Sequence, residues 1–416
     1  MKTNITYLLL GLLLASSSLL PAQTTEPLAL ARAGVRENGA AISGSTVLSN
    51  GTTVIVGDKS MSNSHSKYGF VTFTRSDGSL IKEVLIGEGN PGASEIEGII
   101  AEPGTDNVYV VGHTIIQTGR FKSREKFNND GLVVKFDRQG NVLWHQVFGG
   151  RNTDRYKQIC FSQEGNITVF GTEGTSIMHH QNIMRTLSPN GQMLSRKVLA
   201  FSEDEYIMEA VTAQQGGYWL AVRAISRNPS NNYIILTPSL CRLNSMGNQI
   251  ARTTLKGNKN QQINDLLETA DGQVLLAIKS YSSDGDFIGT GHYLFSFDQQ
   301  AQMQWRQHFL VEAKEIHTMK ITTNTLGEIY CAINVSDVVP EFPLKVVGMV
   351  NIWLAKLDID GGLISKKRVN ALGHFCECTG LDWHQGSLRM SIDGQAKHNM
   401  VTYIPHDAWY CSVADF

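Results

Sequence analysis

Short apolar runs recur along the chain and are separated by segments rich in Gly, Asn and Asp. One unit spans Gly131 to Trp144, GLVVKFDRQGNVLW, and another spans Asn351 to Ile364, NIWLAKLDIDGGLI. Each predicts a strand, a tight turn and a second strand. Similar hairpins are predicted around Asp77-Gly78, Asn190-Gly191, Asn244 to Gly247 and Asp298. Their turns recur at intervals of roughly 50 to 60 residues, a period typical of propeller blades.

A second series of hairpins interleaves with the first. Its turns are marked by Asn50-Gly51, Asp106-Asn107, Glu164-Gly165, Gly216-Gly217, Asp271-Gly272, Gly327 and Gly386. Gly and Asn supply the positive φ that tight hairpin turns need. The second series has one more member than the first, so we expect the chain to begin within a blade. An outer hairpin near Val47 to Val56 would then pair with an inner strand at Met400 to Ile404.

This pairing of N- and C-terminal strands would close the ring and remove its exposed sheet edges. The predicted fold is therefore an all-β, seven-bladed β-propeller of four-stranded antiparallel blades.

The repeat resembles that of secreted bacterial β-propeller proteins of the type common in Bacteroidota. Their units run Asp-x-Trp-Val-x-Lys-Leu-Asp-x-x-Gly, and Asn351 to Gly361 and Asp130 to Gly150 carry most of this pattern. The resemblance covers residues 42 to 405 and implies the propeller fold. It implies little about function, because such repeats serve many roles.

The N-terminal segment predicts export. Lys2, the apolar stretch Tyr7 to Leu14 and a Ser-rich region ending near Ala22 have the form of a signal peptide. We therefore divide the chain into a signal peptide (1–22), a polar lead-in (23–41) and a single propeller domain (42–416). The expected location is the periplasm, the cell surface or the exterior. No cysteine directly follows the apolar stretch and no later run is long enough to span a bilayer, so we expect neither a lipid anchor nor membrane insertion.

Composition excludes few functions. The chain has 416 residues, of which 42% are hydrophobic and 18% charged, as in ordinary globular proteins. Its net charge of -2 creates no field that would attract nucleic acid, so we expect no nucleic-acid partner. The six cysteines could form disulfides in an oxidising compartment or remain buried thiols.

Candidate ligand-binding residues come from the expected face of the propeller. Loops between blades, and loops joining second to third strands, gather on one face around the channel mouth, where ligands usually bind. Polar residues begin several strands there: Lys67, Asp130, Gln181, His292 and Asn351. They could bind a sugar, a peptide or an ion. Alternatively, they satisfy backbone groups between adjacent blades.

Metal ligands are suggested only by fragments of motifs. In an extended strand, His374, Cys376 and Cys378 would share one face, but core packing or a disulfide explains them equally well. The segments Asp284 to Asp286 and Asp358 to Gly361 resemble parts of calcium loops, yet neither continues into the full pattern. Turn aspartates that accept hydrogen bonds from their own backbone explain both. We therefore predict no cofactor and no metal site, with calcium as the open alternative.

No catalytic motif stands out, and a Gly-x-Ser-x-Gly elbow is absent. We interpret the chain as a non-enzymatic binding or scaffold protein of the cell envelope that holds a protein or glycan partner on its loop-rich face. One alternative is a lyase or hydrolase acting on a carbohydrate or small molecule, with Asp130 and His292 as acid and base. Another is a subunit of a larger envelope or secretion assembly.

Overall fold

A computed structural model gives the arrangement of the strands. It describes residues 23–24, 30–32, 40–60, 67–76, 78–87, 94–115, 120–123, 128–176, 179–228, 232–257, 259–309, 315–337, 349–369, 375–384, 386–395 and 406–413. The expected signal peptide, residues 1–22, lies outside this part of the chain. Within the described residues, we find no helix with the length and apolar character that crossing a membrane requires.

Five sheets have four antiparallel strands each. The first contains β3 (Ala40–Val47), β4 (Thr53–Ser60), β5 (Lys67–Thr74) and β6 (Leu80–Ile86). The second contains β7 (Glu95–Ala101), β8 (Val108–Thr114), β9 (Asp130–Phe136) and β10 (Val142–Phe148). The third contains β11 (Asp154–Phe161), β12 (Ile167–Gly174), β13 (His180–Leu187) and β14 (Met193–Val198). The fourth contains β15 (Glu205–Thr212), β16 (Tyr218–Arg227), β17 (Ile234–Leu243) and β18 (Gln249–Thr254). The fifth contains β19 (Gln261–Glu268), β20 (Val274–Ser280), β21 (Gly291–Phe297) and β22 (Met303–Phe309).

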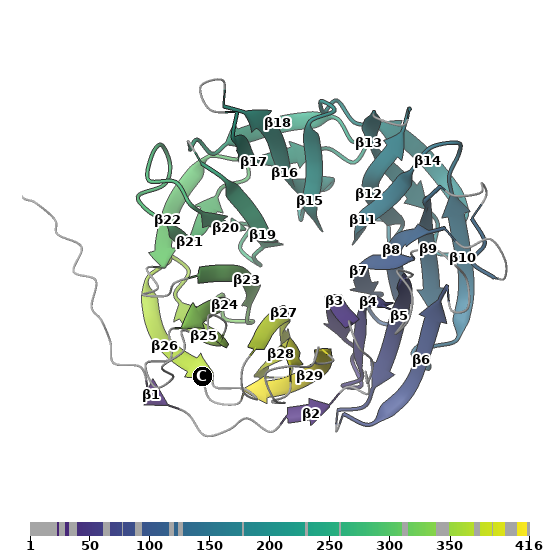
Figure 1. Cartoon of the computed structure of the whole chain (residues 1–416), viewed down its shortest axis with the longest axis horizontal. Coiled ribbons are helices and arrows are strands. Elements are labelled where there is room, and N and C mark those ends of the chain that lie inside the picture. The colour runs from purple at the N-terminus through teal and green to yellow at the C-terminus, as the bar shows by residue number, and fades with distance from the viewer. Residues whose placement is uncertain are drawn as a thin grey trace, which may run out of the picture.

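The sixth sheet has nine strands and is called the large sheet here. It contains β23 (Glu315–Thr323), β24 (Ile329–Asp337), β25 (Met349–Leu357), β26 (Leu363–Val369), β27 (Phe375–His384), β28 (Ser387–Gln395), β29 (His406–Val413), β1 (Gln23–Thr24) and β2 (Leu30–Arg32). The sheets form a ring, and each repeating unit of strands places its first strand nearest the centre (Figure 1). The strands that follow a first strand along the chain are called the second and third strands of that unit. These first strands contact one another in the order β3, β7, β11, β15, β19, β23, β27 and back to β3.

The predicted number of blades is wrong. The described strands form six sheets, five of four strands and one of nine, and not seven four-stranded blades. The units β23–β26 and β27–β29 are merged because β25 and β27 pair in parallel at Val350 and Phe375. Hairpin signals in a sequence identify strands and turns, but they do not show which neighbouring hairpins also pair sideways.

The expected strands of the ring closure also need correction. The segment around Val47 to Val56 belongs to β3 and β4, which form a complete sheet with β5 and β6. Residues 400–404 lie outside the described residues. The pairing between distant ends of the chain involves other strands: β2 is antiparallel to β29, with Leu30 opposite Cys411, and β1 is parallel to β26.

Burial between sheets explains the apolar strands. Every residue of β8 and β9 is buried, because both faces of these strands pack on neighbouring sheets. Val56 and Val71 of the first sheet, for example, join Val108 and Val134 of the second in one apolar cluster. The outermost strand β14 is mostly exposed and carries polar residues. The apolar packing therefore lies between sheets, and polar residues lie on the outer strands at the rim.

The outer turns follow their sequence signatures. The Asp137 carboxylate accepts hydrogen bonds from the amides of Gln139 and Asn141, at 2.9 and 2.8 Å, and Gly140 has a φ of 78°. At the matching turn of the fifth sheet, Ala301 takes the place of glycine and still adopts a φ of 60°. The turn geometry thus persists where the expected glycine is missing.

Candidate functional site

One face of the ring collects polar side chains, and we call it the mouth face. First strands begin there and second strands end there, as β7 and β8 do at Glu95 and His113, which lie opposite each other. In the second strands, the apolar run ends at this level and a polar residue follows it. These residues, called the mouth ring here, are Asp58, His113, Thr172, Arg223, Lys279 and Asn334.

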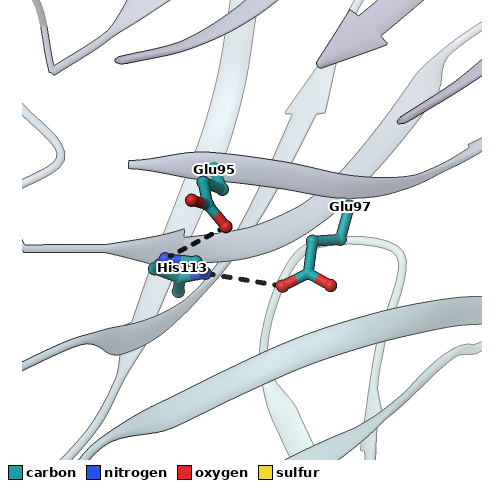
Figure 2. A group of neighbouring side chains, drawn as sticks. All are labelled: Glu95, Glu97 and His113. Carbon is teal, nitrogen blue, oxygen red and sulfur yellow. Dashed lines mark ion pairs between the residues drawn. The ribbon is translucent and has the colours of Figure 1, made fainter. Parts of the chain in front are cut away.

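A histidine between two glutamates lies on this face (Figure 2). Glu95 and Glu97 come from β7 and His113 from β8. The His113 Nε2 atom is 3.8 Å from Glu95 Oε2, and its Nδ1 atom is 3.5 Å from Glu97 Oε1. A β-bulge between Ile96 and Gly98 leaves Glu97 outside the regular ladder, a device that often re-aims side chains near functional sites.

Two lysines flank this trio. Lys67 Nζ lies 3.1 Å from Asp58 Oδ2 and 3.5 Å from Glu95 Oε1, and Lys157 Nζ lies 3.8 Å from Glu97 Oε2. Burial raises the pKa of Asp58 despite the nearby Lys67 ammonium. Burial would also raise the pKa of Glu97, but the neighbouring His113 and Lys157 side chains lower it below the ordinary value. Glu97 is therefore an ionised carboxylate at a partly sheltered surface.

Charged side chains also line the centre of the ring. Lys320 Nζ on β23 lies 3.9 Å from Asp265 Oδ1 on β19 and donates a hydrogen bond to the Asn264 carbonyl at 3.3 Å. Burial raises the pKa of Glu209 on β15 to about 7. It also raises the pKa of Asp382 on β27 to about 6, with the nearby Asp265 acting in the same direction. The inner strands thus surround the channel with carboxylates that resist ionisation.

A pocket of about 320 Å³ lies on the mouth face beside the trio, and we call it the mouth pocket. It is bordered by the second, third and fourth sheets. Its lining residues are Asn128, Arg151, Asn152, Thr153, Arg155, Thr172, Gly174, Ser176, His179, His180 and Tyr206. Two arginines and two histidines are among these described residues, and no carboxylate is.

The pocket walls are held by local contacts. The rings of His180 and Tyr206 pack against each other with centroids 4.7 Å apart. Burial lowers the pKa of His180, so this imidazole stays neutral around neutral pH. His179 Nδ1 lies 2.5 Å from Glu203 Oε2 at the exposed rim. Arg155 lies two residues before Lys157 on β11, and Lys157 pairs with Glu97, so the pocket is next to the trio.

The structure separates the five residues expected to bind ligand. They belong to third strands, which lie away from the centre of the ring (Figure 1). Lys67 joins the trio, as described above. Asp130 and His292 are fully buried, and Gln181 lies beside His180 on β13. Asn351 pairs through its backbone with Val335, and its side chain lies outside the described residues.

Asp130 and His292 lie in the interior and contact other buried groups. Asp130 accepts a hydrogen bond from Ser123 Oγ at 2.9 Å, and a Cβ on Gly149 would come within 1.8 Å of its carboxylate. Burial lowers the pKa of His292 to about 3. Neither side chain is exposed at the surface, and the acid and base roles expected for them stay a prediction.

The suggested metal ligands are also placed only in part. His374 and the side chain of Cys376 lie outside the described residues. Cys378 is buried, and its Sγ atom donates to the Gly380 carbonyl at 3.2 Å. Asp358 and Asp284 accept hydrogen bonds from turn amides, as at Gly362 and Gly285. Cys160, Cys241 and Cys331 are buried thiols outside any disulfide.

Sequence reasoning missed the mouth ring and the trio, although a signal was present. Second strands read as an apolar run ending in a small or apolar residue and then a polar one, as in Val110-Val111-Gly112-His113 and Val56-Gly57-Asp58. The signal lies at the end of each second strand, whereas the expected ligand-binding residues were placed at the start of the third strand.

The comparisons with known proteins support the fold. No known protein family matches the sequence, and no curated protein matches it either. Among solved structures, an ulvan lyase of polysaccharide lyase family PL25 is similar with a TM-score of 0.53, 8% identity and 94% coverage of both chains. The β-propeller domain of the Trilobed protease from Pyrococcus furiosus has a TM-score of 0.48 and 9% identity, covering 90% of this chain and 94% of that one.

A protein of unknown function from Bacteroides caccae has a TM-score of 0.44 and 11% identity, with 75% of this chain and 93% of that one covered. At such low identity, these similarities concern the fold alone. The chain is a β-propeller protein, and the resemblance to Bacteroidota-type repeats stays a prediction.

Proposed function

We propose that this β-propeller is a binding protein that holds an acidic glycan in the mouth pocket. The observation that carries the proposal is the pocket's charge: Arg151 and Arg155 lie in its wall, and none of its described lining residues is a carboxylate. A guanidinium offers paired N–H donors that match a carboxylate or sulfate group. A uronic acid or sulfated sugar presents such groups beside hydroxyls.

The remaining walls suit a sugar ring. Tyr206 and His180 form a small aromatic surface, and aromatic rings combine an apolar face with a polar edge. The amide side chains of Asn128 and Asn152 add donors and acceptors for hydroxyl groups. The volume of about 320 Å³ suits a short part of a glycan, with the rest extending over the face.

Export is part of this proposal. The signal peptide expected over residues 1–22 would bring the propeller into contact with envelope or external glycans. Fractionation of cells that express the full chain, with detection of the mature protein, tests this part separately from binding.

Loss of either arginine should weaken binding of acidic glycans. We expect R151A and R155A each to reduce affinity for a uronic acid oligosaccharide about tenfold or more, because each removes a charge-assisted hydrogen bond. Isothermal titration calorimetry with acidic and matched neutral oligosaccharides measures the effect. Arg138 is exposed in the turn after β9, at the other end of that strand from the pocket, so R138A is the matched control. Equal affinity of wild type and both pocket variants for acidic glycans would contradict the proposal.

A lyase or hydrolase that acts on the bound glycan is the second candidate. The arrangement of Glu95, Glu97 and His113 favours it, since paired carboxylates and an imidazole are common acid and base groups. Glycan incubated with the protein would then gain new chain ends, detectable by chromatography. Binding without any cleavage, under conditions where R151A and R155A lose affinity, would leave the binding protein as the function.

A further inference from the structure

The trio of Glu95, Glu97 and His113 leaves its buried histidine unsatisfied. His113 is 1% exposed, and its Nδ1 atom makes no hydrogen bond within the described residues. The separations of 3.8 and 3.5 Å from the two carboxylates exceed hydrogen-bonding distance. Buried polar atoms are nearly always satisfied in proteins, by other groups, by water or by an ion. The Nδ1 atom of His113 therefore needs a further partner.

We propose that Glu95, Glu97 and His113 bind a divalent transition-metal ion, with Zn²⁺ as the best match. One ligand atom from each residue lies within 4.8 Å of the other two. Ligand atoms at about 2.1 Å from a tetrahedral ion stand roughly 3.4 Å apart, so movements of the glutamate side chains within this cluster would complete the site. A histidine nitrogen with carboxylate oxygens favours Zn²⁺ over Ca²⁺ or Mg²⁺, which prefer oxygen ligands alone.

The three side chains would form an open site. Glu95 faces one ring nitrogen of His113 and Glu97 faces the other (Figure 2). An ion bound to one of these nitrogens would therefore require the glutamate on the other side to rotate its side chain toward it. Three protein ligands leave a fourth position for water or another ligand. The side chains of Glu95 and Glu97 are 29% and 21% exposed, so this position faces the mouth.

Two lysine ammonium groups compete with the ion. Lys67 lies 3.5 Å from Glu95 and Lys157 lies 3.8 Å from Glu97, and both lysine side chains are about 40% exposed. Such partly exposed pairs contribute little energy, so a divalent ion can displace them. Lys67 keeps Asp58 as its partner at 3.1 Å. This competition makes a specific prediction: removing the Lys67 charge should strengthen metal binding.

Calorimetry with the metal alone tests the proposal on the mature, full-length chain after treatment with a chelator. ZnCl₂ should bind with one-to-one stoichiometry, and CaCl₂ should bind more weakly. We expect E97Q and H113Q each to lower Zn²⁺ affinity at least tenfold and K67M to raise it severalfold. H145Q is the matched control, because His145 lies on the outer strand β10, outside both the trio and the mouth pocket.

Since His113 is buried, H113Q could disturb folding, and circular dichroism of each variant checks this. E97Q changes a partly exposed side chain and should not disturb folding, so it tests the proposal even if H113Q is misfolded. Co²⁺ binding gives a second readout, because its visible spectrum changes when nitrogen and oxygen ligands surround it tetrahedrally. Absence of one-to-one Zn²⁺ binding, or Zn²⁺ affinity unchanged in folded E97Q, would overturn the proposal. Neither outcome depends on whether the mouth pocket binds a glycan.

Discussion

Replacing Gly112 with alanine should destabilise the protein by about 2–3 kcal/mol, the scale of overpacking in a close-packed interior. A Cβ at this position would lie 2.0 Å from the Glu95 carbonyl oxygen and 2.9 Å from the Ile96 Cα atom. Both are backbone atoms of β7, so no side-chain rotation can relieve the contact. The start of β7 must move, and Glu95 and Glu97 move with it.

Chemical denaturation of wild type and G112A measures this effect, and Zn²⁺ titration of G112A measures the displacement of the trio. G150A is the matched control, since a Cβ on Gly150 meets no atom within 4 Å. We expect its stability to differ from wild type by less than about 0.5 kcal/mol. A G112A protein as stable as G150A would show that β7 is not packed against β8 as described.

Raising the pH from about 4 to 6 should lower the stability of the wild-type protein by about 2–3 kcal/mol through Asp382. Burial raises the pKa of this carboxyl from its ordinary value of 3.8 to about 6, Asp265 adds to the rise, and Arg389 and Lys320 oppose it. The folded protein therefore holds the proton more tightly than the unfolded chain. Above pH 6 the cost of ionisation is fully present, and below about 4 it disappears.

The D382N variant should lose this part of the pH dependence and be more stable than wild type at pH 7. Urea denaturation at several pH values between 4 and 8 provides the comparison. D360N is the control, because Asp360 is an exposed turn residue. If D382N and wild type show parallel stability across this range, Asp382 does not carry the effect.

The strands and turns were predictable from the sequence, but their lateral pairing was not. Turn signals such as Asp137 to Gly140 and Asp358 to Gly361 fix hairpins locally through hydrogen bonds to nearby amides. Whether β25 also pairs with β27 depends on a contact at Val350 and Phe375 that leaves no local signal. The prediction of seven separate blades is wrong because this pairing merges two units into one sheet.

The site was harder to predict for a related reason. Lys67 was singled out from its position at the start of a strand, yet its partners Asp58 and Glu95 come from two other strands and from two sheets. His113 meets Glu95 because β7 and β8 pair in one register. These side-chain contacts depend on the register of strand pairing and on the bulge at Glu97. The residue types can be read from the sequence, but their convergence cannot.

The large sheet has a consequence for the order of folding. It brings β2 beside β29, so Leu30 and Cys411, which are 381 positions apart, must meet before its hydrogen bonds are complete. Contacts between such distant segments form slowly, because loop-closure entropy opposes them. The five other sheets are built from neighbouring hairpins and can assemble while synthesis continues. Final assembly of the ring must wait until β29 has emerged from the ribosome.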